Sequence, residues 1–352
     1  MSFLLISRKE NCTLSSSVNQ QTARKSSRGS LIALLIVLAI AALILWQRVL
    51  IVDSILAWRY QPSQDIAAIT SAINFSPDGK RIFYASSPEI DGTSTFNAEC
   101  GNTEKTSVVL GCYKAGKIYV YQVDNDELAG VEEVTAAHEM LHAAYERLST
   151  SERQRINSLL ETEAAERLND DAFKERMSVY NKLSDEERIN ELHSVIGTEV
   201  DTITPELETY YEQYFTNRAA VVAMYNDYHS VLVNLQNEAI ALGKSLDAQA
   251  AAINSRVDAY NQAADDLDAA ITQFNSRARG EYFKTQTEFD IARAELVDQS
   301  AALEAERVSI NQAIKAYDAD KRTFDALSSH LTELTNSIDS TLAPAPSVSG
   351  EL

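Results

Sequence analysis

The sequence predicts a mostly helical α+β protein. Its predicted parts are one N-terminal transmembrane helix, a small domain with a short β-sheet and several helices, and a long antiparallel coiled-coil helical hairpin. Three observations predict this fold class. An apolar segment covers 31–52, strand-like and then helical segments follow over 62–204, and two heptad repeats run through 205–340. Apolar residues every three or four positions are typical of packed helices, whereas a long continuous apolar run is typical of a membrane span.

The composition limits the kinds of partner that the chain can bind. Its 352 residues, 45% of them hydrophobic, are enough for a sizeable core. The formal net charge is −20, and no cluster of Lys and Arg follows the N-terminal segment. Because phosphate contacts require clustered basic side chains, we expect no nucleic-acid partner.

The N-terminal segment is typical of a single-pass membrane anchor. Basic residues outnumber acidic ones before the apolar run. The run is interrupted by two polar residues after Trp46 and then continues over 49–52. The positive-inside rule then predicts a cytoplasmic basic tail over 1–30, a transmembrane helix over 31–52 and an extracytoplasmic remainder at the cell membrane. The alternative is a signal peptide cut near 39–41, which would release a soluble secreted protein.

The three cysteines fit this topology. Cys12 lies on the predicted cytoplasmic side, whereas Cys100 and Cys112 lie on the opposite side and are close in sequence. We expect a disulfide between Cys100 and Cys112 in an oxidising compartment, the alternative being two free thiols. Neither belongs to a Cys-x-x-Cys pair, so a zinc role for them is not expected.

The region 62–204 combines strand and helix patterns. β-Branched and aromatic residues predict strands at 81–85 and 117–123, and the turn formers of 76–80 precede the first of them. From Val131 onward the pattern is helical. We therefore expect strands first and a cluster of helices after them.

Capping patterns mark the starts of the later helices. Ser149 and Ser184 are each followed three residues later by Glu, which is the spacing of a capping box, and Pro205 stands at a first helical turn. The helix that begins at Ser184 is predicted to end at Gly197.

The region 205–340 changes to heptad repeats. One apolar seam follows alternating steps of four and three with a shift near Gly243, a second follows strict steps of seven, and 275–283 holds the only turn pattern between them. We therefore predict two long helices folded back on each other, with possible self-association, and a disordered tail over 341–352. The first seam begins with Leu207, Tyr211 and Tyr214 and ends with Leu267, Ile271 and Phe274; the second runs from Phe289 through Leu296, Leu303, Ile310, Tyr317, Phe324 and Leu331 to Ile338.

The most specific motif of the chain is His-Glu-x-x-His, formed by His138, Glu139 and His142 inside a predicted helix. Residues four apart lie on one face of a helix, so both imidazoles can reach a single metal ion. Glu139 would flank that ion as a general base. The alternative is a histidine pair that only satisfies hydrogen bonds in the core.

The motif resembles that of the zincin superfamily of zinc metallopeptidases, over about 110–215 of the chain. That resemblance implies Zn²⁺ as cofactor and a third protein ligand. No metzincin extension follows His142, whereas Asn190–Ser194 is similar to the Asn-Glu-x-x-Ala-Asp element of membrane-associated gluzincins. By this match Glu191 would be the third ligand, and Val195 stands where the family has its Asp. His193 and Glu199 are the alternative third ligands.

Taken together, these features predict a membrane-anchored, extracytoplasmic zinc-dependent peptidase that acts on a peptide or protein substrate. Zinc-activated water would attack the scissile carbonyl, and Glu139 would take the proton. The strand at 117–123 would suit pairing with an extended peptide. Tyr210 and Tyr211 are candidate oxyanion donors, although packing is the favoured interpretation. The alternative function is that of a structural coiled-coil or interaction protein of the cell envelope with an inactive zincin-like domain.

Overall fold

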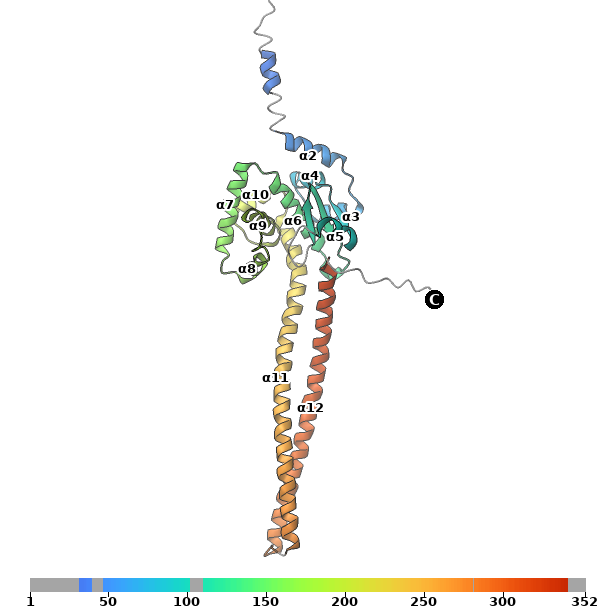
Figure 1. Ribbon diagram of the computed structural model, residues 1–352, viewed down its shortest axis with the longest axis vertical. Helices are drawn as coiled ribbons and strands as arrows, with labels where there is room; N and C mark the ends of the chain where they lie inside the picture. The colour runs from blue at the N-terminus through green and yellow to red at the C-terminus, as the bar shows by residue number, and fades with distance from the viewer. Residues whose placement is uncertain (1–31, 40–46, 102–109, 281, 341–352) are drawn as a thin grey trace, which may run out of the picture. The chain divides into compact units, whose positions relative to one another are not determined.

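The computed structural model describes residues 32–39, 47–101, 110–280 and 282–340 (Figure 1). It divides into two compact units, Met1–Val52 and Asp53–Leu352. The predicted cytoplasmic tail over 1–30 and the predicted disordered tail over 341–352 lie outside the described residues.

The transmembrane helix predicted over 31–52 is contradicted over the residues that the structure describes, and 31 and 40–46 lie outside them. Among the residues that the structure describes, no helix is both long enough and apolar enough to cross a membrane. The end of the predicted span instead belongs to α2 (Arg48–Arg59), which carries a charged residue at each end and Asp53 near its middle. Asp53 is 5% exposed, and its two carboxylate oxygens accept hydrogen bonds of 2.8 and 3.1 Å from Arg147 of the globular domain.

The first part of the globular domain contains more helix than the sequence predicts. The segment 81–85, predicted as a strand, lies in a helix because Ser76 caps its N-terminus and Pro77 occupies the first turn. The predicted turn at 76–80 is therefore a helix start. The elements in order are α3 (Gln64–Ile73), α4 (Pro77–Ala85), β1 (Glu89–Asp91), α5 (Thr93–Cys100), β2 (Gly111–Lys114) and β3 (Lys117–Tyr121).

The three strands form one small sheet in the order β1-β3-β2. β3 pairs parallel with β1, placing Ile90 beside Val120, and antiparallel with β2, placing Cys112 beside Tyr119. The strand predicted at 117–123 thus exists but is central. A peptide could not pair with it, because both of its edges are already hydrogen-bonded.

A cluster of helices follows the sheet, as the capping patterns predict. Full capping boxes are present at Ser149 and Ser184. The helix capped by Ser184 continues past Gly197 to Glu199. The glycine instead serves close packing, because a Cβ at this position would collide with Leu141 and Tyr211. The elements are α6 (Val131–Glu146), α7 (Thr150–Glu166), α8 (Asp171–Ser178), α9 (Asp185–Glu199) and α10 (Pro205–Tyr211), with a 3-10 turn η1 (Asp126–Leu128) before α6.

The core of the globular domain surrounds α6. Most of this helix is buried, including Met140, Leu141 and Ala143, and it contacts α3, α4, α9, β2 and β3. Leu207, Tyr211 and Tyr214, predicted as the start of the coiled-coil seam, belong to this core. The reason is that α10 ends at Tyr211 and the hairpin begins only at Arg218.

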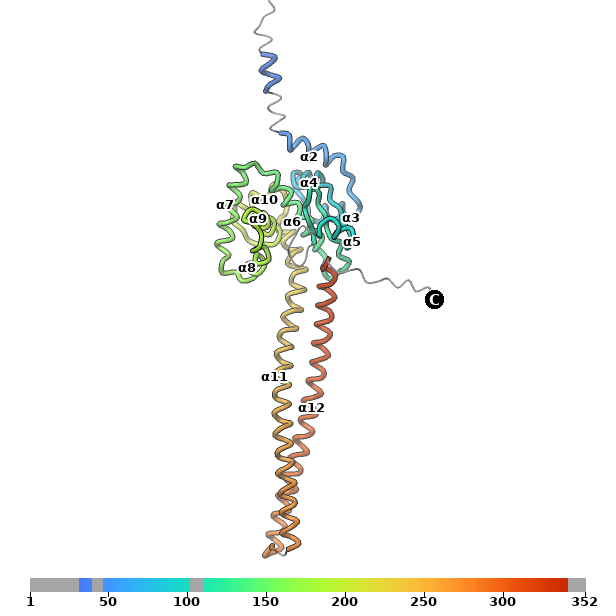
Figure 2. Tube along the Cα trace, viewed as in Figure 1, coloured from blue at the N-terminus to red at the C-terminus, as the bar shows by residue number. Residues whose placement is uncertain are grey.

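Two long helices complete the chain, α11 (Arg218–Arg279) of 62 residues and α12 (Gln286–Ile338) of 53 residues. They pack side by side along their length (Figure 2). Residues that contact each other across the two helices are closer in sequence the nearer they lie to the turn, so the helices pack antiparallel. Gln249 donates a hydrogen bond to Asp320, Arg256 pairs with Glu306, and the Phe274 ring lies 5.1 Å from that of Phe289.

The heptad seams lie along this contact. Leu246, Leu267, Ile310 and Leu334 are buried between the helices or against the domain. Ile271, predicted as a seam residue, is 38% exposed, so the seam passes beside it. The turn predicted at 275–283 is displaced, because 275–279 still belong to α11 and α12 begins only at Gln286.

Candidate metal centre

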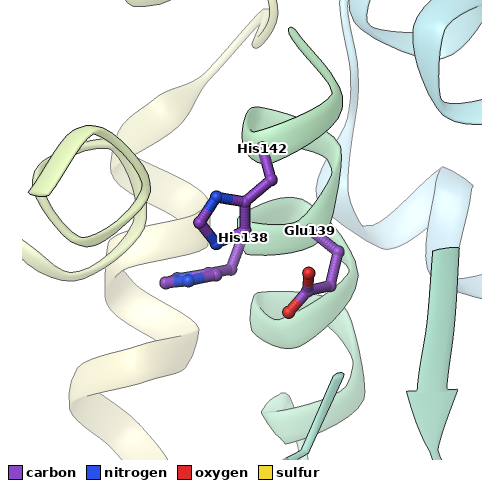
Figure 3. Close-up of side chains that lie close together, drawn as sticks. All are labelled: His138, Glu139 and His142. Atoms are coloured by element: carbon purple, nitrogen blue, oxygen red, sulfur yellow. The ribbon is translucent and has the colours of Figure 1, made fainter. Parts of the chain in front are cut away.

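The helix α6 brings the two histidines of the motif together. His138 and His142 are four residues apart, so their rings lie on one face with centroids 4.8 Å apart (Figure 3). The helix buries its other faces in the core and cannot turn this face away. Ligand atoms of His138, Glu139 and His142 lie within 4.8 Å of one another, a spacing that could hold a metal ion.

A carboxylate from α9 completes the arrangement. Glu191 Oε2 lies 3.4 Å from His138 Nε2, and Glu191 Oε1 lies 3.5 Å from His142 Nε2. The side chain of Glu191 is only 12% exposed. The helix α9 reaches this position because Ser184 caps its start and Gly197 allows it to approach α6 closely.

These donor atoms fit a zinc ion. Ligands about 2.0–2.1 Å from a tetrahedral zinc are separated from one another by about 3.3 Å, close to the two distances from Glu191. In addition, His142 Nε2 is buried and makes no hydrogen bond within the described residues. A buried imidazole nitrogen without a hydrogen bond costs free energy unless it binds a ligand. The donor set, two imidazoles and one carboxylate, is one that zinc accepts.

The two histidines differ in their electrostatics. Burial by itself would lower the pKa of His138, but its hydrogen bond to Glu191 and the charges of Glu139, Glu191 and Glu199 raise that pKa to about 9. Burial lowers the pKa of His142. The metal-free site therefore holds one proton on His138, in the place that a cation would take.

Glu139 points to the side of α6 that faces β2 and is 3% exposed. Gly111, the first residue of β2, allows this approach. A Cβ at position 111 would lie 2.8 Å from Glu139 Cγ and Oε1 and 2.5 Å from Thr135 Cγ2. The absence of a side chain at Gly111 therefore leaves room for the Glu139 carboxylate beside the strand.

Three hollows lie beside the site, and each is lined by residues from 110–116, that is, from β2 and its flanks. The first, about 140 Å³, contains His138, Glu139, Tyr180 and Tyr228 in its wall. The second, about 150 Å³, is lined by Cys112, Glu139, His142 and Glu191. The third, about 460 Å³, lies next to His142 and contains Tyr113 and Gly116. We call these three hollows together the β2 cleft.

The alternative third ligands occupy different positions. His193 is fully buried, its Nε2 lies 2.9 Å from the Tyr210 hydroxyl, and its ring packs among tyrosines. Burial lowers the pKa of His193 to about 3, so the ring is neutral. Glu199 lies on the site side of α9, with Oε1 3.9 Å from His138 Nδ1 and Oε2 3.1 Å from Arg176 Nε.

Tyr210 and Tyr211 lie in the core and not in the β2 cleft. Tyr211 is fully buried and donates a hydrogen bond of 2.7 Å to the carbonyl of His193. These two tyrosines therefore pack, but in the core of the globular domain and not in the coiled coil. Tyr180 and Tyr228 line the cleft instead.

Sequence reasoning missed both of these tyrosines. Tyr228 stands at a heptad position of α11, where an aromatic residue reads as seam packing, and no motif surrounds Tyr180. Gly111 was missed for a similar reason, since its role depends on which strand lies beside Glu139.

The predicted disulfide between Cys100 and Cys112 is present. It joins the end of α5 to β2, and its Cα atoms are 5.9 Å apart. Both cysteines are buried with Phe96 and Tyr121 in a small separate core. The disulfide thus fastens the strand that lines the cleft beside Glu139.

Comparison of the chain with known protein families, with curated proteins and with solved structures finds no match in any of the three.

Proposed function

We propose that this protein is a zinc-dependent peptidase whose metal ligands are His138, His142 and Glu191. The observation that carries the proposal is the position of Glu191, whose two carboxylate oxygens lie 3.4 and 3.5 Å from the Nε2 atoms of the two histidines. The zincin-like motif and the buried Glu139 beside this group support a hydrolytic function over a purely structural metal site.

Bound zinc would supply Lewis-acid activation of a water molecule, whose pKa falls toward about 7 in such sites. The chain supplies the proton transfers. Glu139 would accept the proton of the attacking water and then pass it to the leaving amine. Glu139 directly follows His138, so its carboxylate lies on the same turn of α6 as the histidine ligands.

The β2 cleft supports an extended peptide as substrate. Within the described residues, β2 pairs on one side only, with β3. No described strand pairs with its other edge, where a substrate strand would add, and residues of β2 line all three hollows of the cleft. Main-chain hydrogen bonds to such an edge would bind a peptide in a fixed register, next to Glu139.

Tyr228 is the candidate donor for the oxyanion of the tetrahedral intermediate. It lines the same hollow as His138 and Glu139. Burial, followed by the charge of Glu199, raises the pKa of Tyr228 well above its usual value, so the hydroxyl keeps its proton and can donate it in a hydrogen bond.

The disulfide supports an oxidising, extracytoplasmic compartment for this domain, because such bonds are rare in the reducing cytoplasm. The second candidate function is that of an interaction protein with an inactive zincin-like domain. The size of the hairpin favours it, since α11 and α12 have 62 and 53 residues. Self-association through these helices is part of this second proposal.

The test combines metal analysis with hydrolysis of an unstructured protein such as reduced, alkylated casein. We expect one zinc per full-length wild-type chain, loss of zinc in His138→Ala, and retained zinc with lost hydrolysis in Glu139→Gln. A wild-type protein that binds no zinc would refute the proposal. Stoichiometric zinc with no hydrolysis that depends on Glu139 would favour the interaction protein.

A further inference from the structure

The imidazole of His138 lies between two carboxylates, one at each ring nitrogen. Glu191 lies 3.4 Å from Nε2, and Glu199 lies 3.9 Å from Nδ1. Both acids belong to α9, about two turns apart, and both reach the ring of His138 on α6. A histidine that binds a metal through Nε2 carries its proton on Nδ1, and an outer hydrogen-bond acceptor fixes that tautomer and the ring orientation.

The outer carboxylate is itself held from two further helices. Arg176 of α8 contacts Glu199 Oε2 at 3.1 Å and donates a hydrogen bond of 3.4 Å to the backbone carbonyl of the same residue. The guanidinium lies 4.7 Å above the ring of Tyr225 of α11, whose hydroxyl is also hydrogen-bonded to Glu199. A buried carboxylate is stable in this place only because these partners satisfy it.

We propose that Glu199 is a positioning residue that accepts the Nδ1–H hydrogen bond of His138, and that Arg176 and Tyr225 hold it in place. This inference rests on the proposed zinc-binding role of His138. The gluzincin-like pattern has no acid at Val195, where the usual partner would stand, and Glu199 supplies a carboxylate one turn later on the same helix.

With Glu199 in this role, the N-terminal part of α11 becomes part of the metal centre. Tyr225 supports Glu199, and Tyr228, one turn further along α11, lines the hollow that contains His138. A change in α11 at this point therefore alters zinc affinity without touching a metal ligand.

The test is the zinc affinity of the full-length chain, measured by competition with a chromophoric chelator. We expect Glu199→Ala to bind one zinc with about 10–100-fold lower affinity. Glu199→Gln keeps an acceptor but loses the charge, so its affinity should be intermediate. Tyr225→Phe removes one hydroxyl and should weaken binding by up to about tenfold, the equivalent of one hydrogen bond.

Glu163→Gln is the matched control. Glu163 is 2% exposed and paired with Arg167 at 2.8 Å, but it does not contact the histidines, so its replacement should leave zinc affinity unchanged. In ¹⁵N-labelled zinc-loaded protein, the slowly exchanging Nδ1–H signal of His138 should persist in Glu199→Gln and disappear in Glu199→Ala.

Wild-type affinity in Glu199→Ala would overturn the inference and leave the proposed function intact. Complete loss of zinc from Glu199→Ala, as expected for a ligand, would also overturn it. Absence of zinc from the wild type would instead refute the proposed function, on which the inference depends.

Discussion

Replacing Gly111 with Ala would separate the general base from the metal ligands. The new Cβ would lie 2.8 Å from Glu139 Cγ and Oε1, which is nearer than normal van der Waals contact, and 2.5 Å from Thr135 Cγ2. The flexible Glu139 side chain can move more easily than the backbone of α6. We therefore expect the carboxylate to shift by up to about 1 Å, a displacement that can cost about 100-fold in rate. The accompanying loss of stability should be about 1–3 kcal/mol.

The assay for Gly111→Ala is kcat/KM on the unstructured protein substrate, with zinc content and thermal unfolding measured on the same sample. Zinc should remain stoichiometric, because the atoms nearest to the added Cβ belong to Thr135 and Glu139 and not to a proposed ligand. Gly92→Ala is the control, since its φ is −71° and an added Cβ there meets no atom within 4 Å. Unchanged kcat/KM in fully folded Gly111→Ala would refute the assigned position of Glu139.

Three further predictions follow from the same geometry. Tyr228→Phe should lower kcat by about 10²–10³-fold and retain zinc, because it removes one oxyanion donor; an unchanged kcat would remove Tyr228 from the mechanism. The pKa of His138 is raised to about 9, so below that pH zinc must displace a proton. Zinc affinity measured by competition should then fall about tenfold per pH unit from 9 downward, and a flat profile would contradict the protonated site. Phe274→Ala combined with Phe289→Ala should increase amide hydrogen exchange near the hairpin turn. The free energy of local opening should fall by less than the value of about 3–5 kcal/mol for a fully buried aromatic ring, because both rings are partly exposed. Exchange unchanged at the turn would show that these rings do not hold the helices together.

The parts of the site that depend on local sequence could be predicted. His138, Glu139 and His142 are fixed by the spacing of four residues on one helix, and the helix itself is evident from its alanines and apolar stripe. Glu191 was accessible through the resemblance of 190–194 to the gluzincin element, on the capped helix that begins at Ser184. The hairpin could be predicted because its heptads repeat many times, so a single misplaced residue such as Ile271 does not alter the pattern.

The parts that depend on tertiary contacts could not be predicted. The apolar and aromatic residues of 81–85 resemble a strand, and only the cap at Ser76 with the following Pro77 favours a helix. Gly197 resembles a helix end, but it serves the close packing of α9 against α6. β2 has only four residues, too few for a period, although it lines the whole cleft.

The end of the predicted transmembrane span was misassigned for a similar reason. Hydropathy ranks the residues around 48–52 as the continuation of an apolar run, and the pairing of Asp53 with Arg147 is invisible in the sequence. The ion pair joins residues 94 positions apart and ties the second half of α2 to the end of α6.

We propose that His138, His142 and Glu191 together hold one zinc ion. The most direct test is elemental analysis of the zinc-loaded full-length chain after dialysis has removed unbound zinc. Wild type is compared with Glu191→Ala and His193→Ala. We predict one zinc per chain in the wild type and in His193→Ala, and substoichiometric zinc in Glu191→Ala. Stoichiometric zinc in Glu191→Ala together with its loss in His193→Ala would contradict the account.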